Sequence, residues 1–90
     1  MKEITYFYLK SCPYCRQADR MIEDLLKKEP VFSQVPIRKI EEQEHAEIAD
    51  QYDYYFVPCL YIGKEKLMEG VPSAEKIRSV FLAAMDQTRL

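Results

Sequence analysis

Two cysteines separated by two residues, Cys12 and Cys15, are the residues of this sequence whose types and spacing could do chemistry together. They follow an apolar run, Ile4 to Leu9, and precede an amphipathic pattern that begins at Ala18. The segment therefore reads as a strand, a sharp turn and a helix whose first turn carries both thiols.

A helix N-terminus presents unpaired N–H groups and a partial positive charge, which favour the thiolate form that attacks disulfides. Pro13 suits the first helical position, because its missing N–H costs nothing there. Cys12 then falls at the cap, with its sulfur facing the free N–H groups of Tyr14 and Cys15. Cys15 is placed to attack Cys12 once Cys12 has formed a mixed disulfide, so position alone predicts dithiol redox chemistry.

Two structural roles compete for the same pair. It could be half of a zinc site, but such sites usually have a second Cys pair or a Cys/His pair. It could be a structural disulfide, but so short a loop stabilises little. Redox function is favoured, and no metal site is expected.

Length and composition restrict the classes of protein to which this chain can belong. The chain has 90 residues, 48% of them hydrophobic and 31% charged, as expected for one globular domain spanning residues 1–90. The net charge of −2 and the lack of a basic stripe argue against a nucleic-acid partner. With no signal-peptide pattern and no apolar run of membrane-spanning length, we expect a cytoplasmic monomer away from membranes.

The hydrophobic periodicity predicts the element order βαβαββα. Pro36 favours an edge position for the second strand, and Ser73 is the predicted cap of the last helix. The predicted elements are a buried strand at 4–9, a helix from Pro13 that Pro30 stops, a strand at 35–40, a short helix ending near Tyr52, a hairpin of 59–62 and 65–69 around Gly63-Lys64, and a helix ending near Thr88.

Three other features have ordinary explanations. Residues 41–50 hold five acidic side chains, predicted to be a solvated loop and helix start, and His45 reads as a surface histidine. Cys59 reads as a small buried hydrophobe of the third strand. A regulatory thiol or a metal ligand remains an alternative role for Cys59.

These residues resemble the glutaredoxin branch of the thioredoxin superfamily. The resemblance rests on the Pro-Tyr dipeptide between Cys12 and Cys15, on Val57-Pro58 before the third strand, and on the turn at Gly70. It implies an α/β thioredoxin fold, with a four-stranded mixed sheet flanked by helices. It also implies a cis Pro58 beside the cysteines, and a Val57 backbone that pairs with the bound substrate. Tyr14, Gly70 and Ser73 complete the implied substrate site.

The resemblance further implies the class of substrate and the source of electrons. The substrate would be a disulfide-containing protein or a glutathionylated one. Electrons would come from glutathione or from a flavoprotein reductase, without a tightly bound cofactor.

The sequence departs from the glutaredoxin pattern at two places and from the thioredoxin pattern at a third. Leu9 stands where a cation usually holds a glutathione carboxylate, with Lys10 one residue late. Glu69 precedes Gly70 where a second glycine is usual, and its charge is expected to repel an anionic peptide. Tyr6 stands where thioredoxins keep a buried Asp, so no carboxylate base for Cys15 is evident. The departures predict weak selectivity for glutathione.

Three other functions compete. The first is a thioredoxin-like protein-disulfide reductase that does not use glutathione. The second is a non-catalytic zinc module that uses Cys12, Cys15, Cys59 and His45. The third is an iron–sulfur carrier between two chains, which usually needs only one active-site cysteine.

Overall fold

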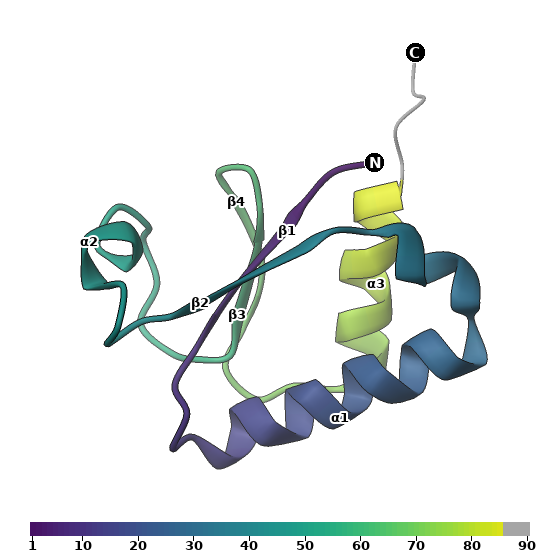
Figure 1. Cartoon of the computed structure of the whole chain (residues 1–90), viewed down its shortest axis with the longest axis horizontal. Helices are drawn as coiled ribbons and strands as arrows, with labels where there is room; N and C mark the ends of the chain where they lie inside the picture. The colour runs from purple at the N-terminus through teal and green to yellow at the C-terminus, as the bar shows by residue number, and fades with distance from the viewer. Residues whose placement is uncertain (86–90) are drawn as a thin grey trace.

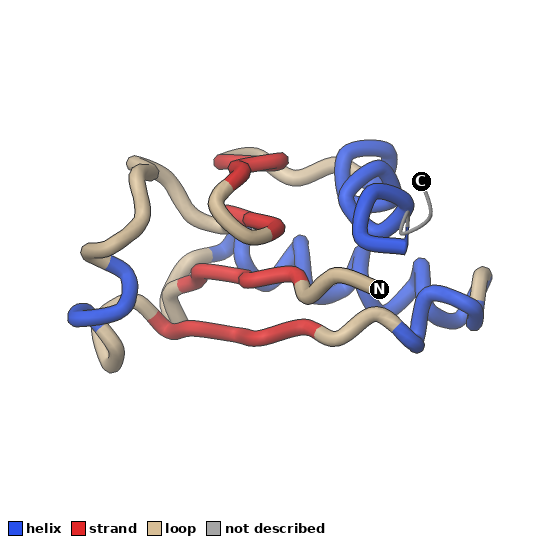
Figure 2. Tube along the Cα trace, turned by 90° about the horizontal axis from the view of Figure 1, so that it is seen from above, coloured by secondary structure: helices blue, strands red, loops and turns tan. Residues whose placement is uncertain are grey.

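A sheet of four strands forms the centre of the computed structural model, which describes residues 1–85 (Figure 1). The strands are β1 (Ile4–Tyr8), β2 (Ile37–Glu41), β3 (Cys59–Ile62) and β4 (Glu65–Glu69). Their order is β2-β1-β3-β4; β1 is parallel to β2 and antiparallel to β3, and β4 is antiparallel to β3. Figure 2 shows the strands side by side. The predicted mixed sheet is confirmed, with β2 at its edge.

The helices divide between the two faces of the sheet. They are α1 (Pro13–Lys28), the 3-10 helix η1 (Pro30–Gln34), α2 (Ala46–Ala49) and α3 (Ala74–Met85). α1 and α3 cover one face, and α2 lies on the other side (Figure 1). The predicted element order is confirmed. The structure adds the 3-10 helix η1, which begins at Pro30. Thr88, the predicted end of the last helix, lies outside the described residues.

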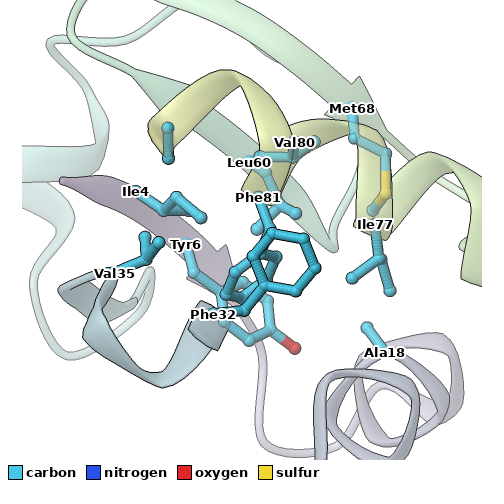
Figure 3. Packing of buried hydrophobic residues seen from close by; sticks show 11 residues of the cluster. Ile4, Tyr6, Ala18, Phe32, Val35, Leu60, Met68, Ile77, Val80 and Phe81 are labelled. Atoms are coloured by element: carbon cyan, nitrogen blue, oxygen red, sulfur yellow. The ribbon is translucent and has the colours of Figure 1, made fainter. Parts of the chain in front are cut away.

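The larger core lies between the sheet and the helices α1 and α3. It joins alternate residues of β1 to one stripe of each helix, as their periods of two and 3.6 residues require. Figure 3 shows side chains from β1, η1 and α3 converging there. Its buried members are Ile4, Tyr6, Ala18, Phe32, Val35, Leu60, Met68, Ile77, Val80, Phe81 and Ala84.

A smaller aromatic core covers the opposite face. Phe7, pointing away from α1, is fully buried. Its ring lies 4.8 Å from Tyr54, stacked, and 4.7 Å from Tyr52, tilted. Cys59 and Tyr61 share this face, whereas Leu60 and Ile62 pack on the other, as the alternation of side chains along a strand requires. Both faces of β1 are therefore buried, which explains its nearly unbroken apolar sequence.

Glu44, Glu47 and Asp50 of the acidic segment are exposed, as predicted, but Glu41 differs from the prediction. Glu41 is not solvated: it ends β2 with 5% of its surface exposed. Its carboxylate accepts N–H groups from Lys10 at 3.1 Å, Gln43 at 2.7 Å and Glu44 at 3.0 Å. These bonds, that of Lys10 first, hold the pKa of Glu41 below its ordinary value. The buried charge is retained because it satisfies three backbone donors at the end of the strand.

Within residues 1–85, no helix is both long enough and apolar enough to cross a bilayer.

Phe81 provides a test of the larger core. It is 1% exposed, and its ring centroid lies 5.8 Å from that of Phe32. Phe81→Ala should lower the free energy of unfolding by about 3–5 kcal/mol, because it leaves a cavity that the sheet and helices cannot close. Denaturant unfolding measures this. The matched control is Leu82→Ala on the same helix, where the side chain is 46% exposed. Equal losses from both variants would contradict the described core.

Candidate active site

The chain turns sharply between β1 and α1, and Cys12 lies at the end of this turn. Its N–H donates to the Leu9 carbonyl at 3.2 Å, and its own carbonyl accepts N–H groups from Cys15 at 3.1 Å and Arg16 at 3.2 Å. Cys12 has extended backbone angles, and Pro13 begins the helix. The predicted cap position of Cys12 is therefore confirmed.

The sulfur of Cys12 does not take the direction expected from the cap. No side-chain cap hydrogen bond forms, and the N–H of Cys15 is already bound to the Cys12 carbonyl. Cys12 Sγ lies instead 3.8 Å from the carbonyl oxygen of Val57, to which the thiol can donate. The Val57–Pro58 peptide is cis, as the resemblance implied. The fold thus brings together two sites that are 45 residues apart in the sequence.

The two thiols of the pair lie in different surroundings. Cys12 is partly exposed, whereas Cys15, in the first turn of α1, is 1% exposed. Burial is the main cause that raises the pKa of the Cys15 thiol to about 12, and the neighbouring Cys12 raises it further. At neutral pH a reagent in solution therefore meets Cys12 first.

A carboxylate near Cys15 was missed by the sequence reasoning. Asp19 lies outside the apolar stripe of α1, which predicts a solvated side chain, but it is only half-exposed and accepts the Tyr6 hydroxyl at 2.9 Å. Tyr6 Oη also lies 3.1 Å from the Cys15 carbonyl oxygen, and Lys39 Nζ lies 3.6 Å from Asp19. Burial, and then the bond to Asp19, raise the pKa of Tyr6. The i, i+4 spacing from Cys15 to Asp19 could have indicated this proximity, because residues four apart on a helix are neighbours.

The structure brings together only some of the other predicted site residues near Cys12. Tyr14 lies between Cys12 and Cys15 in the sequence and is 45% exposed. Gly70 has φ +88°, a conformation that favours glycine, and its N–H donates to the Pro58 carbonyl at 2.9 Å. Ser73 accepts the Lys76 N–H at 3.1 Å and so caps α3, as predicted. The structure assembles Val57, Pro58 and Gly70, while the Ser73 hydroxyl is used by its own helix.

Glu69 does not present a free charge. Its carboxylate pairs with Lys66 Nζ at 2.7 Å and accepts the backbone N–H groups of Tyr55 and Phe56. These partners, Lys66 first, lower the pKa of Glu69 to about 2. The expected repulsion of an anionic peptide is therefore largely cancelled by this local ion pair.

The four candidate zinc ligands are not assembled. Cys59 is completely buried on the sheet face opposite α1, and burial raises its pKa to about 12. His45 is exposed at the start of α2, with Nδ1 3.9 Å from Glu47. Among the residues that the structure describes, no group of three or more His, Cys, Asp or Glu side chains is positioned to hold a metal ion. The predicted burial of Cys59 is confirmed.

Comparison with known proteins places this geometry in a family. The sequence model of the thioredoxin domain matches residues 2–82. The chain belongs to the thioredoxin-domain family. No curated protein sequence matches the chain significantly.

Solved structures share the fold at low sequence identity. A mutant thioredoxin from Halobacterium salinarum has 19% identity and a TM-score of 0.69, covering 96% of this chain and 76% of its own. Thioredoxin O2 from Arabidopsis thaliana has 23% identity and a TM-score of 0.63, covering 92% and 74%. A structure described as a malarial protein has 16% identity and a TM-score of 0.67, covering 92% and 96%. The predicted thioredoxin fold is confirmed, and it suggests thiol–disulfide oxidoreductase chemistry.

The different surroundings of the thiols predict their order of alkylation. At pH 7 Cys12 should react with iodoacetamide at least about tenfold faster than Cys15 or Cys59, because both buried thiols are covered and their raised pKa values keep them protonated. Mass spectrometry of time points in the three single-cysteine variants measures the rates. Unfolding in denaturant should bring the three rates together. Equal rates in the folded protein would contradict the described burial.

Proposed function

We propose that this protein is a dithiol oxidoreductase that reduces protein disulfides or mixed disulfides with glutathione. The observation that carries the proposal is the pairing of an accessible Cys12 at the cap of α1 with a buried Cys15 one turn further on. A nucleophilic thiol must reach a substrate in solution. A resolving thiol needs to meet only the mixed disulfide beside it.

The proposed reaction balances within the thiols and the substrate. Cys12, as thiolate, attacks one sulfur of the substrate disulfide; the substrate S–S bond breaks and its leaving sulfur takes a proton. Cys15 then loses its proton and attacks Cys12 Sγ, releasing the second substrate thiol. The substrate gains two electrons and two protons, and Cys12 and Cys15 become a disulfide. A thiol reductant, either glutathione or a flavoprotein reductase, returns the pair to the dithiol form.

The backbone of Val57 is the proposed contact for the substrate chain. Its carbonyl oxygen lies 3.8 Å from Cys12 Sγ, so a peptide bonded through Cys12 would lie along the Val57–Pro58 segment. Tyr14 and Gly70 border the same place, and the start of α3 at Ser73 is the proposed end of the binding site. Backbone pairing accepts many side chains, which suits a reductase of several proteins.

A specific observation favours the second candidate, a thioredoxin-like reductase that does not depend on glutathione. The cation nearest to the glutaredoxin position is Lys10, and its ammonium group is paired with Glu44. Leu9, at the position itself, offers no charge to a glutathione carboxylate. We therefore propose protein disulfides as the preferred substrates and weak selectivity for glutathione.

The roles of the two cysteines are tested by serine replacement. Cys12→Ser should abolish turnover of a disulfide-bonded protein, because the nucleophile is lost. Cys15→Ser should still attack and should accumulate the mixed disulfide, which intact-mass spectrometry detects. Cys59→Ser is the control and should keep wild-type turnover within about twofold, since its sulfur is buried on the other face. Total loss in both active-site variants without any adduct would contradict the assigned roles.

The weak selectivity for glutathione is tested by adding the absent cation. Leu9→Lys should raise activity in an assay coupled to glutathione and its reductase several-fold, because a charge-assisted contact adds about 1.5–3 kcal/mol before solvent screening reduces it. The gain should shrink at 1 M salt.

Val31→Lys is the matched control, since it adds the same charge on exposed η1, beyond the far end of α1. It should leave the coupled rate unchanged. A wild-type protein that already deglutathionylates a model peptide as well as a glutaredoxin with the full set of binding residues would contradict this proposal.

A further inference from the structure

The carboxylate of Glu69 has three partners, and two of them belong to the segment that reaches Cys12. One oxygen accepts the Phe56 N–H at 2.9 Å and also the Tyr55 N–H; the other lies 2.7 Å from Lys66 Nζ. The Glu69 side chain is 20% exposed, so these contacts are partly shielded from water. Such contacts order a loop more firmly than a fully exposed ion pair does.

A register shift in the hairpin places Lys66 and Glu69 on the same face. Cys59 is opposite Glu69 and Tyr61 is opposite Lys66, with a shift in register between Leu60 and Tyr61. Residues three apart on a regular strand point to opposite faces. The extra residue of the shifted strand restores a common face, on which Lys66 can neutralise Glu69. With its charge neutralised by Lys66, the Glu69 carboxylate can accept the backbone N–H groups of Tyr55 and Phe56.

The Tyr55–Pro58 segment is held at both of its ends. Glu69 binds the N–H groups of Tyr55 and Phe56, and the Gly70 N–H binds the Pro58 carbonyl at 2.9 Å. Val57 lies between these two attachments, and its carbonyl oxygen faces Cys12 Sγ at 3.8 Å. The end of β4 therefore sets the position of the backbone that lies against the reactive sulfur.

The same attachments leave large apolar side chains at the surface. Tyr55 is 83% exposed and Phe56 is 66% exposed, although both backbones are tied to Glu69. Tyr14 and Val71 are also exposed, beside Cys12 and Gly70 respectively. Tyr55 and Phe56 directly precede Val57, and Val71 directly follows Gly70, so a chain paired with Val57 would meet apolar side chains near its cysteine.

We propose that Glu69 is a positioning residue for peptide substrates: it fixes the Tyr55–Pro58 segment so that an extended chain with apolar side chains near its cysteine pairs with Val57 beside Cys12. This role rests on the proposed disulfide reductase function. It predicts that Glu69 matters for substrates with a peptide backbone and does not matter for a small disulfide, which reaches Cys12 without using the segment.

The test compares two substrates in the full-length protein. Glu69→Ala should lower kcat/KM for a disulfide-bonded peptide with apolar residues next to its cysteine by about tenfold or more, because the pairing backbone is no longer held. It should leave kcat/KM for hydroxyethyl disulfide within about twofold. Glu69→Gln keeps one acceptor oxygen and should retain more of the peptide activity than Glu69→Ala does.

Glu65→Ala, an exposed residue of the same strand, is the matched control and should leave both rates unchanged. Faster amide hydrogen exchange at Tyr55 and Phe56 in Glu69→Ala would confirm that the carboxylate holds them. Equal falls for the peptide and the small disulfide would indicate a general structural role and overturn the proposal, as would no fall for either. A wild-type protein inactive on every disulfide would instead contradict the proposed function itself.

Discussion

The burial of β1 on both faces is the constraint on which the rest of the structure depends. Tyr6 points into the core under α1 and α3, and Phe7 points into the aromatic core on the other side. A strand buried in this way has one fixed position, and the chain leaves its end directly toward Cys12. The same strand pairs with β3, and the residue just before β3 is Pro58. One buried strand thus sets the places of both Cys12 and the Val57 carbonyl.

Unequal burial gives the two thiols of one motif different properties. Cys12 ends a turn at the surface, whereas Cys15 lies one turn along α1 on the side that faces the sheet. Burial of Cys15 makes its thiolate costly, and Asp19 adds to that cost. Burial therefore keeps Cys15 as a neutral thiol in the reduced protein. The chemical asymmetry of the two thiols follows mainly from the burial of Cys15.

Several carboxylates of this protein accept hydrogen bonds from backbone N–H groups or from tyrosine hydroxyls. Glu41 closes the end of β2, Glu69 holds the segment before β3, and Asp19 accepts the hydroxyl of Tyr6. Acceptors at strand ends satisfy N–H groups that the sheet leaves unpaired, which allows short strands to end close to the site. The site is therefore built as much on these acids as on the apolar cores.

Local patterns in the sequence determined the elements and the redox pair. Alternation, helical stripes, the cap at Ser73 and the turn at Gly63 each involve neighbours within a few residues, so they can be read without a structure. The Cys12–Cys15 spacing before a helix belongs to this class, and the edge position of β2 followed from Pro36. Contacts across the sheet decided the rest. The family resemblance implied that Pro58 lies beside the cysteines, but the contacts of Cys12 with the Val57 carbonyl and of Glu69 with Phe56 depend on strand order and on a register shift. No local pattern records these two features, because both are set by how distant segments pack.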